Sequence, residues 1–130
     1  MNRFIGYSDN MERPTCITPW SYIHLLSGLN FSLLSLSYLS KHSVIKNLII
    51  FIIIHTIYEC KDLYITYIIS NNKKYYQNTL INSIGDTIFS IFGWILGYII
   101  YLSKPNTYYV ISFVILQLIS VALFILNRYG

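Results

Sequence analysis

The chain alternates long apolar segments with short polar ones, and this pattern predicts four membrane-spanning helices. The apolar segments cover about residues 18–40, 44–69, 79–102 and 107–127. Each is roughly 20 residues or longer, which is the length of helix that crosses a hydrocarbon core of about 30 Å. We therefore expect an all-α fold, a membrane-embedded four-helix bundle with short loops, formed by residues 18–130 as a single domain.

Residues 1–17 interrupt this pattern, because they are polar, mixed in charge and broken by Pro14. A cleavable signal peptide would have a brief apolar core directly after a short basic region, whereas here the apolar segment begins late and is too long. We predict a loosely ordered polar N-terminal tail outside the membrane.

Composition supports a membrane protein and excludes an ordinary soluble domain. Charged residues make up 11% of the chain, hydrophobic residues 55%, and the mean hydropathy is +0.52. A soluble domain has about 25% charged residues. The net charge of +4 does not predict nucleic-acid binding, because the basic residues stand singly or in pairs at segment ends and form no basic stripe. The lipid bilayer is thus the expected partner, and a homo-oligomer is left open.

The distribution of basic residues predicts the orientation. Four spans place both termini on one side of the membrane, together with Arg3, Arg13, Lys73, Lys74 and Arg128. The opposite side carries Lys41, Lys46 and Lys104. By the positive-inside rule this imbalance predicts cytoplasmic termini.

Polar and ionisable side chains interrupt three of the four apolar segments. At about 1.5 Å per residue their depths along the helices agree, so we expect one polar site in the half of the bilayer nearest the termini. Inserting a charged side chain at membrane depth costs roughly 2.5 to 3.5 kcal/mol, so residues of this kind are candidates for a functional role. The candidate site residues are His24, His55, Glu59, Asp62, Asn82 and Asp86.

The three carboxylates suggest a cation. Glu59 and Asp62 share a helix face with His55, and a helical hairpin would bring Asp86 opposite them. Clustered carboxylates in a low dielectric must be protonated, paired or bound to a cation. A divalent cation is therefore the candidate cofactor, with Glu59, Asp62 and Asp86 as candidate metal ligands.

Small residues predict where helices approach each other. Gly93 and Gly97 form a GxxxG pair in the third span, and Ser27 and Gly28 lie on the small and polar inner face of the first span. The leucines of the first span are then expected to face lipid; they are Leu25, Leu29, Leu33 and Leu36.

Three groups of residues carry a resemblance to a known family. They are His24 with Ser27-Gly28, the segment from Tyr58 to Leu63, and the segment from Tyr76 to Asp86 followed by Gly93. They resemble a family of small multi-pass bacterial membrane proteins classed as a domain of unknown function (number 2585), over about residues 20–100.

The chain departs from that family at several positions. Asp62 stands where the family has Glu, Leu63 where it has Asn, and Gln77-Asn78-Thr79 where it has Gly-Asp-Ser. A fainter similarity links the chain to VanZ-like membrane proteins. Both resemblances imply a membrane protein, and neither implies a reaction.

Three functions remain open from the sequence. The first is a multi-pass membrane protein whose intramembrane pocket binds a cation or a lipid headgroup, and a bound cation could activate water or polarise a phosphate. The second is a structural or assembly protein whose polar residues only lock helix packing, at roughly 0.6 kcal/mol per hydrogen-bonded pair. The third is a proton or cation conduit.

Overall fold

The computed structural model describes residues 3–9, 14–38, 43–69 and 78–129. The described chain is helical, as predicted, with four long helices that follow the four apolar segments. Their bounds are α1 (Ser21–Tyr38), α2 (Val44–Tyr64), α3 (Leu80–Leu102) and α4 (Thr107–Tyr129). A π-helical segment, η1 (Ile65–Ile69), continues α2. Of the basic residues used above to predict orientation, Arg13, Lys41, Lys73 and Lys74 lie outside the described residues.

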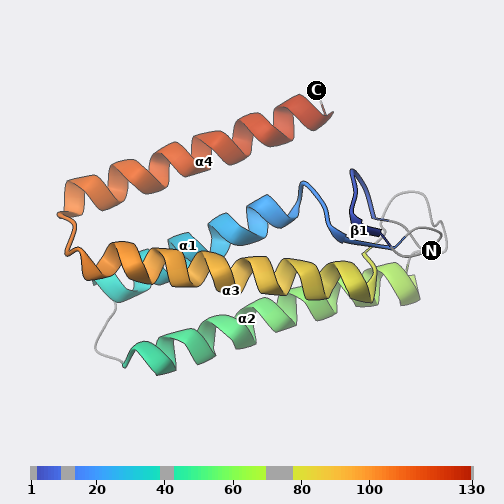
Figure 1. Ribbon diagram of the computed structural model, residues 1–130, viewed down its shortest axis with the longest axis horizontal. Helices are drawn as coiled ribbons and strands as arrows, with labels where there is room; N and C mark the ends of the chain where they lie inside the picture. The colour runs from blue at the N-terminus through green and yellow to red at the C-terminus, as the bar shows by residue number, and fades with distance from the viewer. Residues whose placement is uncertain (1–2, 10–13, 39–42, 70–77, 130) are drawn as a thin grey trace.

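The helices alternate in direction along the chain. In Figure 1, α1 and α3 run side by side in the centre, α2 lies along one flank and α4 stands apart on the other. The start of α1 and the end of α4 lie at the same end of the molecule, next to the N-terminus. Helices α1 and α3 form the most extensive contact in the fold, and they decide where the site residues lie.

Glycine allows α1 and α3 to touch along their backbones. A Cβ atom on Gly28 would collide with the carbonyl oxygen of Ser90, and a Cβ on Gly93 would collide with that of Leu25. Gly97 lies just as close to α1. No side chain fits between backbones at this separation, so these positions require glycine.

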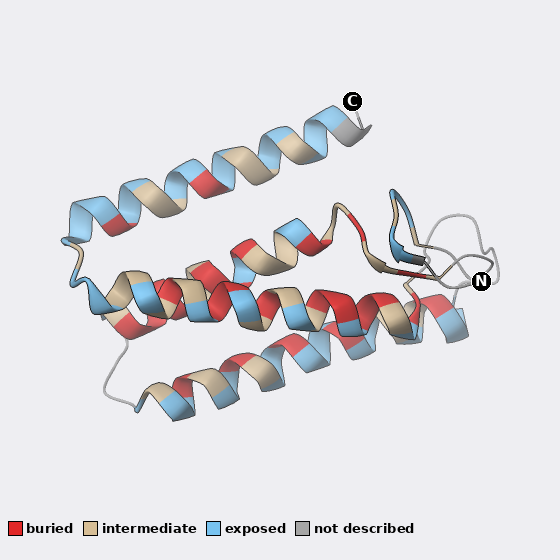
Figure 2. Cartoon of the chain, viewed as in Figure 1, coloured by how far each residue is buried: buried red, intermediate tan, exposed pale blue. Residues whose placement is uncertain are grey.

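The leucines of α1 do not face lipid as predicted. Leu29, Leu33 and Leu36 are 6%, 0% and 2% exposed, and Leu25 is partly buried. Ser27, which was expected on the inner face, is exposed. The prediction assumed one buried face, but α1 is covered by α3 and α2 together, so a second face of this helix is also buried (Figure 2).

The described part of the N-terminal tail, residues 3–9 and 14–17, is not loose as predicted. Strands β1 (Arg3–Ile5) and β2 (Thr15–Ile17) pair in parallel, and β2 packs on α3. The Asp9 carboxylate accepts hydrogen bonds from the backbone N–H groups of Thr15 and Thr79, both at 2.7 Å, and from the Thr79 hydroxyl at 3.0 Å. Thr79 is the N-cap of α3. Asp9 therefore links the N-terminal arm, which contains β1 and β2, to the N-terminal end of α3, where a negative charge is favourable.

A polar bridge joins three helices at the opposite end of the bundle. The indole N–H of Trp94 donates to Oδ1 of Asn47 at 3.1 Å, and the amide of Asn47 donates to the Ser35 hydroxyl at 2.7 Å. All three residues are buried beside the apolar core of Leu36 and Phe51. The bridge connects α3, α2 and α1, and the sequence analysis did not find it.

Two of the described helices are long and apolar enough to cross a membrane. They are α3 over its whole length and α4 from Thr107 to Asn127. Length and composition thus support two candidate spans, which is fewer than the four that the apolar pattern predicts.

Candidate metal centre

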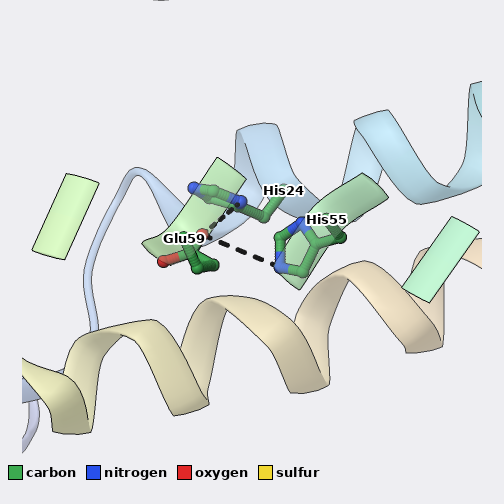
Figure 3. A group of neighbouring side chains, drawn as sticks. All are labelled: His24, His55 and Glu59. Atoms are coloured by element: carbon green, nitrogen blue, oxygen red, sulfur yellow. Dashed lines mark ion pairs between the residues drawn. The ribbon is translucent and has the colours of Figure 1, made fainter. Parts of the chain in front are cut away.

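Two imidazoles and one carboxylate converge between α1 and α2 (Figure 3). His24 lies in the first turn of α1, while His55 and Glu59 lie one turn apart on α2. Oε1 of Glu59 is 3.4 Å from Nδ1 of His24 and 3.7 Å from Nε2 of His55. One potential ligand atom of each residue lies within 4.8 Å of the other two. This arrangement is compact enough to surround a single metal ion.

Two of these atoms are buried without a hydrogen-bond partner. His55 is 6% exposed and Glu59 is 4% exposed. Within the described part of the chain, neither Nε2 of His55 nor Oε1 of Glu59 has a hydrogen-bond partner. A buried polar atom left in this state costs about 1 to 3 kcal/mol. The two atoms lie 3.7 Å apart, which is too long for a hydrogen bond between them.

The second carboxylate oxygen of Glu59 is held by α3 and the residues before it. Oε2 accepts a hydrogen bond from the Ser83 hydroxyl at 2.7 Å and from the Asn78 amide at 3.2 Å. These two bonds fix the plane of the carboxylate. Oε1 is consequently turned toward the two imidazoles.

Asp86 approaches the ring nitrogen of His24 that does not face Glu59. Its Oδ2 is 3.5 Å from Nε2 of His24, and its Oδ1 accepts a hydrogen bond from the Ser21 hydroxyl at 2.5 Å. Asp86 is 2% exposed. Metal-binding histidines commonly direct their second ring nitrogen to a carboxylate, which fixes the tautomer and the ring orientation. Asp86 is placed for that role, rather than beside Glu59 as a further ligand.

Two predicted site residues lie apart from this group. Asp62 is half-buried and forms an ion pair with Lys61, at 2.9 Å between Nζ and Oδ1. Asn82 donates to the carbonyl oxygen of Cys16 at 3.3 Å, so its side chain contacts the N-terminal arm. Among the described residues, the compact group consists of Glu59 and the two histidines, and neither Asp62 nor Asp86 belongs to it.

The sequence analysis missed the hydroxyl groups that support the site. Ser21 and Ser83 each lie three residues before an ionisable site residue, His24 and Asp86 respectively. Residues three apart share a helix face, and this spacing was the available signal. Asn78 had no such signal, because it precedes α3 and reaches Glu59 only through the fold.

A groove of about 480 Å³ opens beside the two histidines, between α1, α2 and α4. Its walls are mostly aliphatic and aromatic, and its polar lining residues include His24, His55 and Ser27. The ring of His55 stacks on Phe51 at 6.0 Å between centroids, and it meets His24 edge-on at 5.4 Å. The lining residues are Trp20, Ile23, His24, Ser27, Phe31, Phe51, Ile54, His55, Tyr58, Val121 and Ile125.

Comparisons with known protein families, with curated proteins and with solved structures found no match to this chain. The resemblance to the domain of unknown function 2585 stays a prediction.

Proposed function

We propose that the chain is a multi-pass integral membrane protein in which His24, His55 and Glu59 bind one divalent transition-metal ion, with Zn²⁺ as the best match. All four helices span the bilayer, and the site lies in the half nearest the termini. The proposal has two parts, membrane insertion and metal binding, and different observations support them.

Membrane insertion is supported by an inverted distribution of polarity. The buried residues of α2 are Asn47, Phe51, His55 and Glu59. Its exposed residues include the isoleucines Ile45, Ile49, Ile50, Ile53, Ile54 and Ile57. A soluble helix would bury these isoleucines and expose the polar residues, whereas a helix surrounded by lipid has no reason to do so. Helix α2 therefore lies in the membrane beside α3 and α4, although its polar residues lower its mean hydropathy.

Metal binding is carried by the two unpartnered atoms, Nε2 of His55 and Oε1 of Glu59. Ligand atoms about 2.0 to 2.2 Å from a tetrahedral Zn²⁺ lie about 3.3 to 3.6 Å from each other. The distances from Oε1 of Glu59 to the two imidazole nitrogens are 3.4 and 3.7 Å. A metal ion would thus satisfy both orphan atoms with little rearrangement.

The ligand types select the class of metal. Mg²⁺ and Ca²⁺ prefer ligand sets made entirely of oxygen, whereas imidazole nitrogens favour zinc and neighbouring transition metals. Two histidines and one glutamate also form the ligand set of zinc sites that keep a fourth position open for water or substrate. The site is consequently of the open, reactive type rather than a closed structural one.

Metal content of the purified protein tests the proposal. The Zn²⁺ content of the protein purified in detergent is measured by elemental mass spectrometry. We expect close to one Zn²⁺ per chain in the intact protein and a loss of this Zn²⁺ in Glu59→Gln. Asp62→Asn is the matched control, because Asp62 is a neighbouring carboxylate outside the ligand group. Fe²⁺ and Mn²⁺ are supplied in parallel samples to identify the preferred ion.

The opposite result would favour packing as the role of these residues. If neither Zn²⁺ nor any other divalent ion binds to the intact protein or shifts its melting temperature, then the histidines and Glu59 serve only to lock the helices. Equal metal content in Glu59→Gln and the intact protein would likewise contradict the assigned ligands.

A further inference from the structure

We propose that the groove beside the metal centre binds a membrane lipid with a phosphate-bearing head group. The alkyl chain lies between α1, α2 and α4, and a phosphate oxygen occupies the open position on the metal. This inference rests on the proposed metal site and names the ligand that the site takes from the bilayer.

The size and walls of the groove suit an alkyl chain. Its volume of about 480 Å³ falls within the range of about 300 to 1,000 Å³ that is usual for small-molecule sites. Ile54 and Val121 form part of its sides. The rings of Phe31 and Phe51, 5.1 Å apart between centroids, lie at the end farther from the start of α1. Apart from the polar groups near the metal centre, this surface offers an alkyl chain only apolar contacts.

The direction of the groove matches the direction of a lipid in the adjacent leaflet. Along α1 it reaches from Trp20 to Phe31, about 16 Å at 1.5 Å per residue, and His24 is only about 6 Å from the Trp20 end. Tryptophan favours the membrane interface. The metal centre is therefore near head-group depth, and the rest of the groove extends toward the middle of the bilayer.

Helix α4 leaves room for this ligand. In Figure 1 it lies apart from the other helices, and side-chain contacts join it to the start and to the end of α1. At one end Phe124 packs against Trp20 and Tyr22, and at the other the Tyr38 hydroxyl donates to the carbonyl of Thr107. The groove lies on the inner side of α4, next to Val121 and Ile125, where a lipid chain can enter between helices.

Charge favours a phosphate head group over a neutral one. Zn²⁺ with one carboxylate ligand keeps a positive charge, and it binds and polarises phosphoryl oxygens. The ammonium group of Lys61 lies 3.9 Å from the centre of the Tyr58 ring, and Tyr58 lines the groove at 6.2 Å from the His24 ring. Lys61 thus places a cation against Tyr58, a residue of the groove wall, although Lys61 does not itself line the groove and is paired with Asp62.

The experiment replaces Zn²⁺ with Co²⁺, whose visible spectrum reports on its ligands, in protein held in a nonionic detergent. Dodecyl phosphate is the lipid probe and inorganic phosphate is the free-anion probe. We expect dodecyl phosphate to change the cobalt spectrum at a concentration at least tenfold lower than inorganic phosphate. Ile54→Trp, which fills the groove, should remove this advantage, and both probes should then act at similar concentrations.

Ile57→Trp is the matched control, since Ile57 is an exposed isoleucine of the same helix that does not line the groove. It should behave as the unaltered protein. The inference is overturned if both probes act equally on the unaltered protein, if neither changes the spectrum, or if Ile54→Trp keeps the preference for dodecyl phosphate. A protein that binds no Co²⁺ at all instead refutes the metal site itself, so the two failures are distinguishable.

Discussion

The imidazole of His24 lies between two carboxylates, with Asp86 3.5 Å from its Nε2 and Glu59 3.4 Å from its Nδ1. Asp86 is itself held by Ser21 and Glu59 by Ser83, so each carboxylate reaches the ring in a fixed orientation. An imidazole held in this way presents Nδ1 to the proposed metal position and Nε2 to Asp86. Roles for the individual residues follow, and they can be separated by substitution.

Asp86→Asn should weaken Zn²⁺ affinity without abolishing binding. Loss of an outer carboxylate partner of a metal-binding histidine lowers affinity about 10- to 100-fold. Zinc affinity is measured by competition with a chromogenic chelator, with Glu59→Gln as the reference for a lost ligand. An Asp86→Asn protein that binds Zn²⁺ as tightly as the intact chain would show that Asp86 does not position His24.

Gly93→Ala should destabilise the bundle by about 1 to 3 kcal/mol, the usual cost of overpacking. The added methyl group would collide with the carbonyl of Leu25, and α1 and α3 would have to separate. Ile95→Leu serves as the control, because Ile95 is 43% exposed on the same helix. Thermal unfolding in detergent measures both, and equal melting temperatures would argue against close backbone packing.

Asn47→Leu should destabilise the protein by about 1 to 3 kcal/mol, because it leaves the buried indole N–H of Trp94 without its acceptor. Zinc content should stay unchanged, since the Asn47 bridge lies at the other end of the bundle. Thermal unfolding and metal analysis of the same preparation check both statements. Ile49→Leu, an exposed position on α2, provides the reference for a neutral change.

Asp9→Ala should release the N-terminal arm from α3. Three hydrogen bonds to Thr15 and Thr79 are lost, together with a favourable charge at a helix N-terminus worth about 0.3 to 1 kcal/mol. Hydrogen exchange at the amides of Thr15 and Thr79 should accelerate, whereas that in the middle of α3 should not. Unchanged exchange at both amides would mean that Asp9 does not fasten the arm.

A cysteine at Phe4 and a cysteine at Lys104 should be labelled from opposite sides of the membrane. The proposed four-span topology places the arm and the connection between α3 and α4 on different faces. The background is a chain with Cys16 and Cys60 replaced by serine. Labelling of both positions by an impermeant reagent from the same side would contradict the topology, and labelling of Phe4→Cys from outside would contradict cytoplasmic termini.

The helices could be predicted from the sequence because their signal is local. Apolar runs separated by Pro105 and by polar turns determine where a helix begins and ends. The bounds of α2 taken together with η1, of α3 and of α4 follow the runs within two residues. The closeness of His55 to Glu59 was also local, since residues four apart share a helix face. The arm escaped prediction because its strands pair across eleven other residues and depend on Asp9 reaching Thr79.

Only the tertiary structure decided which polar residues meet. Spacing placed Asp62 on the same face of α2 as His55 and Glu59, but that face is wide. The position of α1 brings His24 to Glu59, whereas Asp62 forms an ion pair with Lys61. Burial of the α1 leucines also depends on the tertiary structure. A helix with two packed neighbours buries two faces, and the periodicity of its own sequence does not predict the second one. Backbone contact at Gly28 and Gly93 sets the position of α1 against α3, and it thereby places His24 between Asp86 and Glu59. Such contacts join residues far apart in the chain, so no local pattern encodes them.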